Sequence, residues 1–194
     1  MRLQAFEVAD SEKPDLLYRL LNKENGRCLI FSRTKRGTER IAKSLNRQGV
    51  NAAMMHGDRS QSQRTAALTG FQRGRYRVLV ATDVAARGIH VQDIAHVINY
   101  DLPEVAENFI HRVGRTGRAG ERGVASTLFV REQRTELFEL ERTLGIRMER
   151  VYTNGRSFEE VARTHRPGLE RLSTSPRPRM IRLPGEFLQA QMDC

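Results

Sequence analysis

Cysteine is scarce in this chain, which is the first of several absences that restrict its class. The 194 residues include only Cys28 and Cys194, which match no metal-ligand or redox spacing. This usage argues against a disulfide framework and is typical of a reducing cytosol. The charged, alternating first ten residues are unlike a signal peptide, and the apolar runs fall far short of the ~20 residues of a membrane span. We expect a soluble cytoplasmic protein with no membrane partner.

The two motifs of a self-sufficient P-loop ATPase are also missing. Such an enzyme needs G-x-x-x-x-G-K-[S/T], whose amides and lysine hold the phosphates, but none of the four lysines follows a glycine. The acidic D-E-x-D or D-E-x-H string that serves magnesium and water is absent. Asp83, which ends "VLVATD", resembles a metal-holding aspartate but has no phosphate cradle, and glycines 114, 117 and 120 lack the dinucleotide-binding spacing. The chain alone is therefore predicted not to be a complete ATPase.

Zinc-ligand spacing is missing as well. His90 and His96 have no cysteine or histidine companions at such spacing, so we predict no metal site. We place His56 in an "HGD" turn and His96 at a strand edge. The aromatic residues at 18, 31, 71 and 129 fit core positions better than a platform for stacked bases.

Positive charge is abundant, and arginine carries most of it. The formal net charge is +10, with 29 arginines and 4 lysines. A guanidinium is planar, permanently charged and able to bind phosphate through two hydrogen bonds. The excess favours a polyanionic partner, although an arginine-rich genome with a solvated surface explains the composition equally well.

Strand-like and helix-like segments alternate to about residue 150. Apolar runs typical of strands occur at 3–8, 28–32, 51–56, 78–82, 96–100 and 125–130. Between them, helices are predicted for the capped "SEKPDLLYRLL", after Thr34, after Ser60 with Gln63 at capping-box spacing, after Pro103, and over 132–144. This order predicts an α/β fold: an open, mostly parallel sheet with helices on both faces, whose ligands bind at the carboxyl ends of the strands.

The composition changes near the C-terminus. Four of the six prolines and seven arginines lie beyond residue 154. We therefore divide the chain into a domain at 1–152 and a Pro/Arg-rich tail at 153–194. The tail is interpreted as a loosely packed extension or as a docking arm that contacts RNA.

The stretch "HRVGRTGR", 111–118, places Arg112, Arg115 and Arg118 three residues apart with no carboxylate among them. The apolar stripe of the preceding helix would anchor that helix to the core, and Gly114 would end it and free Arg115 and Arg118. In phosphoryl transfer, an arginine from a second domain stabilises charge on the phosphate oxygens. The alternative is that these arginines only satisfy the last carbonyls of a helix.

Five stretches together resemble one family. "LIFSRT" (29–34), "HGDRSQSQR" (56–64), "VLVATDVAARGIH" (78–90), "VINYDLP" (97–103) and "HRVGRTGR" (111–118) occur in the order of the motifs in the second RecA-like domain of DEAD-box RNA helicases. The resemblance covers roughly residues 1–150. In related families the last motif usually begins with Gln, so His111 indicates the DEAD-box branch.

The resemblance implies a role for each matched residue. Arg115 and Arg118 match the residues that touch the ATP phosphates, Arg118 being the preferred finger, and Gly88 and His90 match the part that meets the ribose. The expected interdomain coupling residues are His111, Arg112, Asp83 and Arg87. The expected RNA-backbone contacts are Thr34, Gly57, Gln61, Arg64 and Thr82, although Gln61 and Arg64 are also consistent with the polar face of a capped helix.

His90 departs from the family pattern, which usually has Asp there to accept a hydrogen bond from a ribose hydroxyl. A neutral imidazole accepts through one nitrogen only, and a protonated imidazole cannot accept at all. We predict weakened or rearranged ribose recognition with the phosphate contacts retained. His90→Asp in the full-length enzyme should therefore change the apparent ATP affinity, and an unchanged affinity would refute the prediction.

The combined interpretation is the C-terminal lobe of an ATP-dependent DEAD-box RNA helicase. An N-terminal RecA-like domain, absent here, would supply the phosphate loop and most of the magnesium site. A stand-alone, non-catalytic RNA-binding or regulatory module is the rival, favoured by a methionine close to the start of the domain and by His90. A DNA helicase of the same superfamily is a third interpretation, which His111 disfavours.

Overall fold

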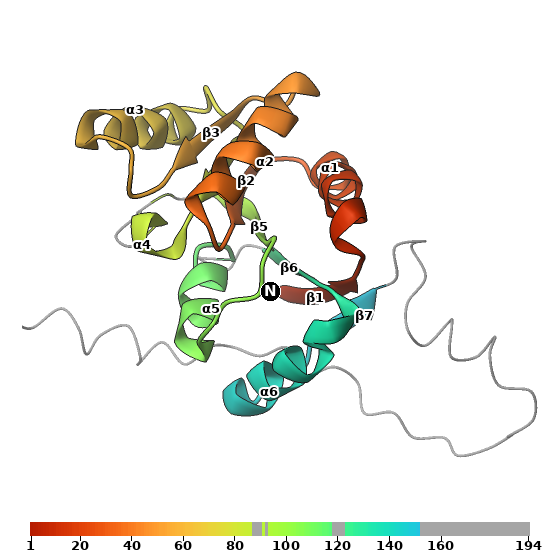
Figure 1. Cartoon of the computed structure of the whole chain (residues 1–194). Coiled ribbons are helices and arrows are strands. Elements are labelled where there is room, and N and C mark those ends of the chain that lie inside the picture. Colours follow the sequence, from red (N-terminus) through yellow and green to blue (C-terminus); the bar gives the residue numbers. More distant parts are fainter. Residues whose placement is uncertain (87–90, 92, 118–122, 152–194) are drawn as a thin grey trace, which may run out of the picture.

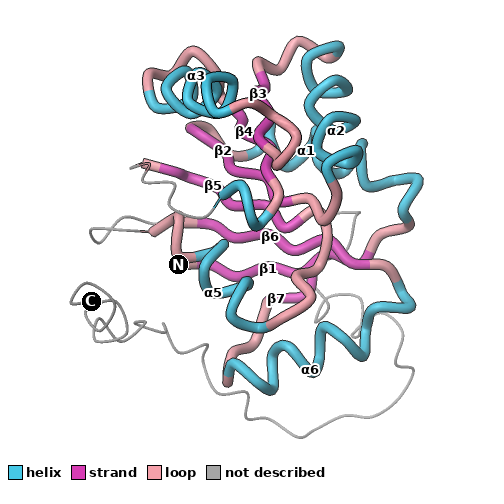
Figure 2. Tube along the Cα trace, turned by 60° about the vertical axis from the view of Figure 1, so that its left-hand side comes forward, coloured by secondary structure: helices cyan, strands magenta, loops and turns pink. Residues whose placement is uncertain are grey.

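A single seven-stranded sheet forms the centre of the molecule (Figures 1 and 2). The computed structural model describes residues 1–86, 91, 93–117 and 123–151. The strands are β1 (Arg2–Glu7), β2 (Arg27–Phe31), β3 (Ala52–Met55), β4 (Val78–Ala81), β5 (Ile94–Asn99), β6 (Val124–Phe129) and β7 (Glu149–Val151). Their order is β3-β4-β2-β5-β6-β1-β7 and every pairing is parallel, so the predicted fold class is confirmed.

Helices cover both faces of this sheet. They are α1 (Lys13–Lys23), α2 (Lys35–Arg47), α3 (Gln61–Gln72), α4 (Asp83–Ala86), α5 (Ala106–Val113) and α6 (Arg134–Leu144), with short 3₁₀ turns at η1 (Asp10–Glu12) and η3 (Arg131–Gln133). Leucines of α1 and α2 pack on one face against Cys28 and Ile30. Phe71 of α3 and Phe109 of α5 pack on the other face, on the side of Leu29 and Phe31. Figure 1 shows α1 and α5 on opposite sides of the strands.

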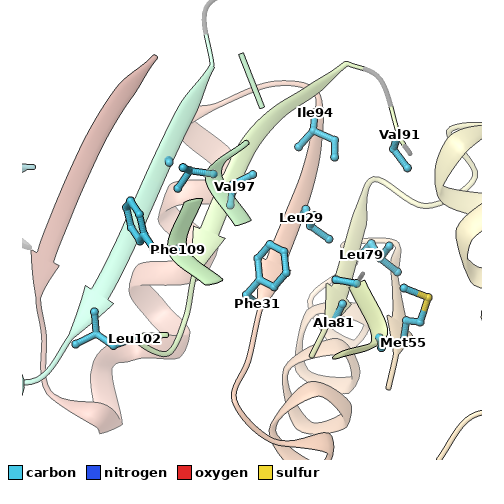
Figure 3. Close-up of a cluster of buried hydrophobic side chains, with 14 of the residues drawn as sticks. Leu29, Phe31, Met55, Leu79, Ala81, Val91, Ile94, Val97, Leu102 and Phe109 are labelled. Carbon is cyan, nitrogen blue, oxygen red and sulfur yellow. The ribbon is translucent and has the colours of Figure 1, made fainter. Parts of the chain in front are cut away.

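Alternation along β2 explains how one strand serves both clusters. Its side chains point to the two faces in turn and are buried on each, as in a strand covered on both sides. Figure 3 shows Leu29 and Phe31 in the cluster that also holds Phe109 and Leu102. Cys28 lies on the other face, where burial raises the pKa of its thiol and keeps it in the neutral form. This rigid core fixes the loops at the carboxyl ends of the strands.

Local capping sets where two of the helices begin. The Thr34 side chain accepts a hydrogen bond from the Gly37 N–H at 2.9 Å, which caps α2. Ser60 and Gln63 form the predicted capping box at the start of α3. The first helix corrects an expectation: it follows a 3₁₀ turn, begins at Lys13, and has no side-chain cap.

Two elements and one placement were not foreseen from the sequence. The short helix α4 and the edge strand β7 were not predicted. The expected position of His96 at a strand edge is wrong, because β5 is the middle strand of the sheet and His96 is buried. The proposed tail, 153–194, lies outside the described residues.

Candidate functional site

Four of the nine predicted site residues that the structure describes follow the carboxyl ends of neighbouring strands. Thr34 comes after β2, Gly57 after β3, and Thr82 and Asp83 after β4. Because β3, β4 and β2 are adjacent and parallel, these residues lie along one edge of the sheet. A backbone hydrogen bond from Thr82 N–H to the Met55 carbonyl, at 3.3 Å, joins the ends of β4 and β3 directly.

Gly57 has open space above its backbone. A methyl group added to its Cα would meet only the Lys35 side chain, at 3.5 Å, which is ordinary contact. Lys35 Nζ also donates to the carboxylate of Asp58, the next residue, and this contact fastens the loop that contains Gly57. No described residue therefore requires glycine at this position, although glycine does let another molecule approach the backbone closely.

Arg64 leans from α3 onto α4. Its Nη1 donates to Gln61 Oε1 at 3.3 Å, and its Nη2 contacts the Ala85 carbonyl at 3.5 Å. Its Nε is buried and has no hydrogen-bond partner among the described residues. A buried donor left unpaired costs roughly 1–3 kcal/mol, so a further acceptor for this nitrogen would stabilise the side chain.

Arg112 is the largest buried polar side chain at this edge, and its side chain is only 2% exposed. Its Nε and Nη2 donate to the two Asp83 carboxylate oxygens at 2.6 and 2.7 Å. Its Nη1 donates to the Asp101 carbonyl at 2.8 Å and to Asn99 Oδ1 at 3.3 Å. The guanidinium also lies 5.1 Å from the centre of the Phe31 ring. The arginines of the "HRVGRTGR" stretch are therefore not one outward row, because Arg112 points inward and ties α5 to α4.

The remaining residues of that stretch surround the end of α5. Arg115 is half-buried, and its Nε donates to the His111 carbonyl at 3.2 Å, as the helix-end interpretation expects. Thr116 is buried and donates to the carbonyl of Ile94, which joins the stretch to β5. Gly117 has φ +69°, a left-handed conformation that favours glycine. Arg118, Gly88, His90 and Arg87 lie outside the described residues.

Sequence reasoning missed several residues that line a pocket of about 200 Å³ at this edge. Arg33, Glu104 and Asn108 line it together with Thr82, Asp83 and Arg112. Val84, also in its wall, is 72% exposed although it is apolar. Arg33 lay inside the quoted "LIFSRT" stretch, whose threonine alone was singled out.

Two further polar groups, the buried His96 and the partly exposed Asp101, have roles inside the domain. His96 Nε2 lies 2.8 Å from Ser126 Oγ, and burial lowers the pKa of the imidazole to about 4. Asp101 accepts hydrogen bonds from the Ser32 hydroxyl and the Arg33 N–H at 3.1 and 2.8 Å, which fastens the end of β5 to that of β2.

In the described part of the chain, no three His, Cys, Asp or Glu residues are placed to hold a metal ion. None of the described helices is both long and apolar enough to span a bilayer.

Comparison with known proteins agrees with this fold. Residues 12–120 match the model of the helicase conserved C-terminal domain family. The chain is 43% identical over 146 residues to the DEAD-box ATP-dependent RNA helicase CshA of Geobacillus kaustophilus, covering 75% of this chain and 31% of that protein. It is 46% identical over 142 residues to the ATP-dependent RNA helicase RhlB of Pseudomonas syringae pv. tomato, covering 72% and 36%.

The chain belongs to the DEAD-box helicase family as its C-terminal, RecA-like domain. It spans about a third of the length of these curated relatives. A solved DEAD box protein from Methanococcus jannaschii superposes with a TM-score of 0.74 at 39% identity, covering 78% of this chain and 42% of that one. The C-terminal domain of the DEAD-box protein Dbp5 superposes with a TM-score of 0.73 at 30% identity, covering 84% and 96%. In this DEAD-box domain, the edge built from Thr34, Gly57, Thr82 and Arg112 is the candidate site.

Proposed function

We propose that this DEAD-box domain is one lobe of an ATP-driven RNA-unwinding enzyme and that it supplies an arginine finger and half of the RNA groove. The other half, with the phosphate loop and most of the magnesium site, belongs to an N-terminal RecA-like lobe. The CshA and RhlB relatives are both ATP-dependent RNA helicases, which supports RNA and ATP as the ligands. ATP, when bound between the lobes, supplies the phosphoryl group that is transferred to water.

The RNA half of the proposal rests on donors and on open backbone at one edge of the sheet. Among the residues that the structure describes, the buried Arg64 Nε has no partner, and a phosphate oxygen would satisfy it if the side chain turned outward. Gly57 leaves room for a strand to approach the backbone, while Thr34, Gln61 and Thr82 add polar side chains along the same edge. Contacts of this type recognise the sugar–phosphate chain rather than the bases.

The buried Asp83–Arg112 pair is the single observation that carries the proposal. Asp83 directly follows Thr82 on the RNA side, and Arg112 lies on α5 between His111 and the arginines that would face ATP. The two oxygens of one carboxylate hold two nitrogens of one guanidinium, so α4 and α5 are joined at a fixed angle. We assign Arg112 and Asp83 a positioning role, in which RNA at Thr82 and phosphates at Arg115 and Arg118 are aligned through this pair. His111 and Arg87 are the remaining coupling residues of the proposal.

The arginines at 115 and 118 would act in phosphoryl transfer. Their guanidiniums would donate to the phosphate oxygens on which charge accumulates, in a cleft from which closure of the lobes excludes water. Gly88 and His90 would border the ribose of the same nucleotide. Because no lysine follows a glycine anywhere in the sequence, the isolated chain should not hydrolyse ATP.

The test joins this chain to the N-terminal lobe of a DEAD-box relative and compares Arg118→Ala with a matched control, Arg131→Ala. Arg131 is an exposed arginine at the start of η3, outside the site. We expect Arg118→Ala to slow RNA-stimulated hydrolysis on the order of a thousand-fold, while RNA affinity without nucleotide stays unchanged. The control should be as active as the parent.

Three outcomes would contradict the proposal. If Arg118→Ala lost hydrolysis and RNA affinity equally, Arg118 would belong to the RNA groove. If the joined lobes bound RNA without RNA-stimulated hydrolysis, a non-catalytic RNA-binding module would be the better conclusion. Turnover by the pure isolated chain would refute the argument from the missing phosphate loop.

A further inference from the structure

The outer face of α2 carries a stripe of positive charge. Arg36, Arg40, Lys43 and Arg47 are all exposed. They recur at intervals of four, three and four residues, which places them within roughly 60° of one another around a helix that turns about 100° per residue. We call these four residues the α2 stripe. They form one continuous row along the helix.

The stripe is directly opposite the face that α2 buries. Thr38, Ile41, Ala42 and Leu45 are buried, and the three apolar residues pack into the core on the α1 side of the sheet. The four cations therefore lie on the outward, exposed side of α2. Burial raises the pKa of the Tyr100 phenol, and Arg40 lies near enough for its charge to lower that pKa in part. The positive charge of the stripe must be explained by solvation or by a partner.

Carboxylates neutralise many arginines elsewhere in the domain, but not those of the stripe. Arg2, Arg27, Arg134 and Arg150 each lie within 3.1 Å of a carboxylate. By contrast, among the described residues no hydrogen bond or ion pair engages the arginines at 36, 40 or 47. The one acidic residue of α2, Glu39, lies 3.6 Å from Lys43 and 3.3 Å from His56 Nε2.

The surface around α6, near the other edge of the sheet, also carries exposed arginines, but its charges are of mixed sign. Exposed arginines also occur at 131, 142 and 147, on and around α6. There, however, they alternate with exposed Glu132, Glu136 and Glu139, so the surface is of mixed sign. Such a mixed face is typical of a solvated helix. The stripe concentrates charge of one sign instead.

The stripe begins at the proposed RNA groove. Thr34, the first of the proposed backbone contacts, is the N-cap of α2, and Arg36 lies in the first turn of the same helix. At 1.5 Å per residue, the row from residue 36 to residue 47 extends roughly 16 Å away from that cap. A nucleic-acid strand that leaves the groove over the N-terminus of α2 would meet these guanidiniums in succession.

We propose that the α2 stripe binds the phosphates of an RNA strand that continues beyond the groove of Thr34, Gly57 and Thr82. This inference rests on the proposed function and extends its RNA site along a second surface. Three of the four cations are arginines, which can bind phosphate through two parallel hydrogen bonds. A folded protein partner fits less well, because none of the exposed large apolar side chains in the described part lies on α2 to form the centre of an interface.

Counterion release gives the size of the expected effect. Each phosphate neutralised on a single strand contributes about 0.7 to the slope of log K against log salt. Replacing Arg36, Arg40 and Arg47 with Gln should therefore lower the slope by about 2 for an RNA long enough to leave the groove. If the affinities converge near 1 M salt, the loss at 0.1 M is about a hundredfold.

The experiment measures fluorescence anisotropy of labelled single-stranded RNAs with the full 194-residue chain at several salt concentrations. One RNA has about six nucleotides, enough only for the groove, and the other about fifteen. The matched control replaces the arginines at 131, 142 and 147 with Gln, which removes the same charge from the α6 side. A second variant, with Lys at 36, 40 and 47, keeps the charge and should retain most of the slope. Circular dichroism verifies that each variant is folded.

The proposal predicts a loss that is large for the long RNA, small for the short RNA, and absent in the control. An equal loss in the stripe variant and the control would mean that net charge alone acts, and the proposal would be overturned. Unchanged binding of the long RNA by the stripe variant would overturn it as well. If the chain joined to the N-terminal lobe of a DEAD-box relative bound neither RNA, the proposed RNA function itself would fail, which is a result distinguishable from failure of the stripe.

Discussion

Replacing Arg112 with Met should destabilise the domain strongly, because this buried guanidinium satisfies acceptors on two segments, α4 and the end of β5. The substitution keeps a similar side-chain volume but leaves the Asp83 carboxylate, Asn99 Oδ1 and the Asp101 carbonyl without their donor. Removing one partner of a buried pair costs about 3–5 kcal/mol. The Asp83 side chain is 25% exposed and water can reach it, so we expect the lower end, about 3 kcal/mol.

Urea unfolding at 25 °C, followed by circular dichroism on the full chain, measures this loss. In a domain of this size, about 3 kcal/mol corresponds to a fall in Tm of about 6–12 °C. Arg134→Met is the control, since the Arg134–Glu7 pair has a similar distance, 2.7 Å, but its arginine side chain is 58% exposed rather than 2%. An exposed pair of this kind contributes about 0–1 kcal/mol.

A double-mutant cycle separates the pair from its neighbours. Asp83→Asn leaves the guanidinium buried without a negative partner and should also cost about 3 kcal/mol. Once one partner is gone, removing the other should cost less, so the double variant should be about 2 kcal/mol more stable than additivity predicts. The reasoning is refuted if Arg112→Met costs no more than Arg134→Met, or if the two changes at the buried pair add within about 0.5 kcal/mol.

Two further predictions concern Gly57 and His96. Gly57→Ala should leave the free energy of unfolding within about 0.5 kcal/mol of the parent, because the added methyl group finds space in the domain. It should nevertheless weaken RNA binding, because the same methyl group would obstruct an RNA strand. Unchanged RNA affinity in the anisotropy assay would refute this prediction. His96 is buried in its neutral form with its pKa lowered to about 4 from 6.5, so its contribution is complete above pH 6.5 and declines as the pH falls towards 4. Urea unfolding should show a loss of about 2–3 kcal/mol from this group between pH 7 and 4.5, and His96→Gln, which can still pair with Ser126, should remove that part of the pH dependence. An identical pH profile in the variant would count against this assignment.

The helix starts and the buried strands could be predicted because short capping and apolar patterns in the sequence agree with the way these elements pack. Thr34 and the pair Ser60 and Gln63 cap their helices as their spacing predicted, and the unbroken apolar run at 78–81 became a strand buried on both faces. Those features depend on neighbours a few residues away. Their outcome could therefore be predicted from one short window of sequence at a time.

The features that could not be predicted depend on distant partners. Arg112 stands in a stretch rich in positive charge, and nothing within it signals that Asp83, 29 residues earlier, accepts two of its hydrogen bonds. His96 sits in the middle of the sheet because Ser126, on the adjacent strand, accepts or donates a hydrogen bond there. The strand β7 has only three residues and forms because β1 offers it an edge.

The position of β1 within the sheet has a consequence during synthesis of the chain. Its two neighbours are β6 and β7, so a strand that ends at residue 7 finds no native strand partner before residue 123. At about 5–20 residues per second, the nascent strand waits roughly 6–25 s with both of its edges unpaired. During that interval Ala5 and Phe6, which end up buried, remain accessible to chaperones and to other nascent chains.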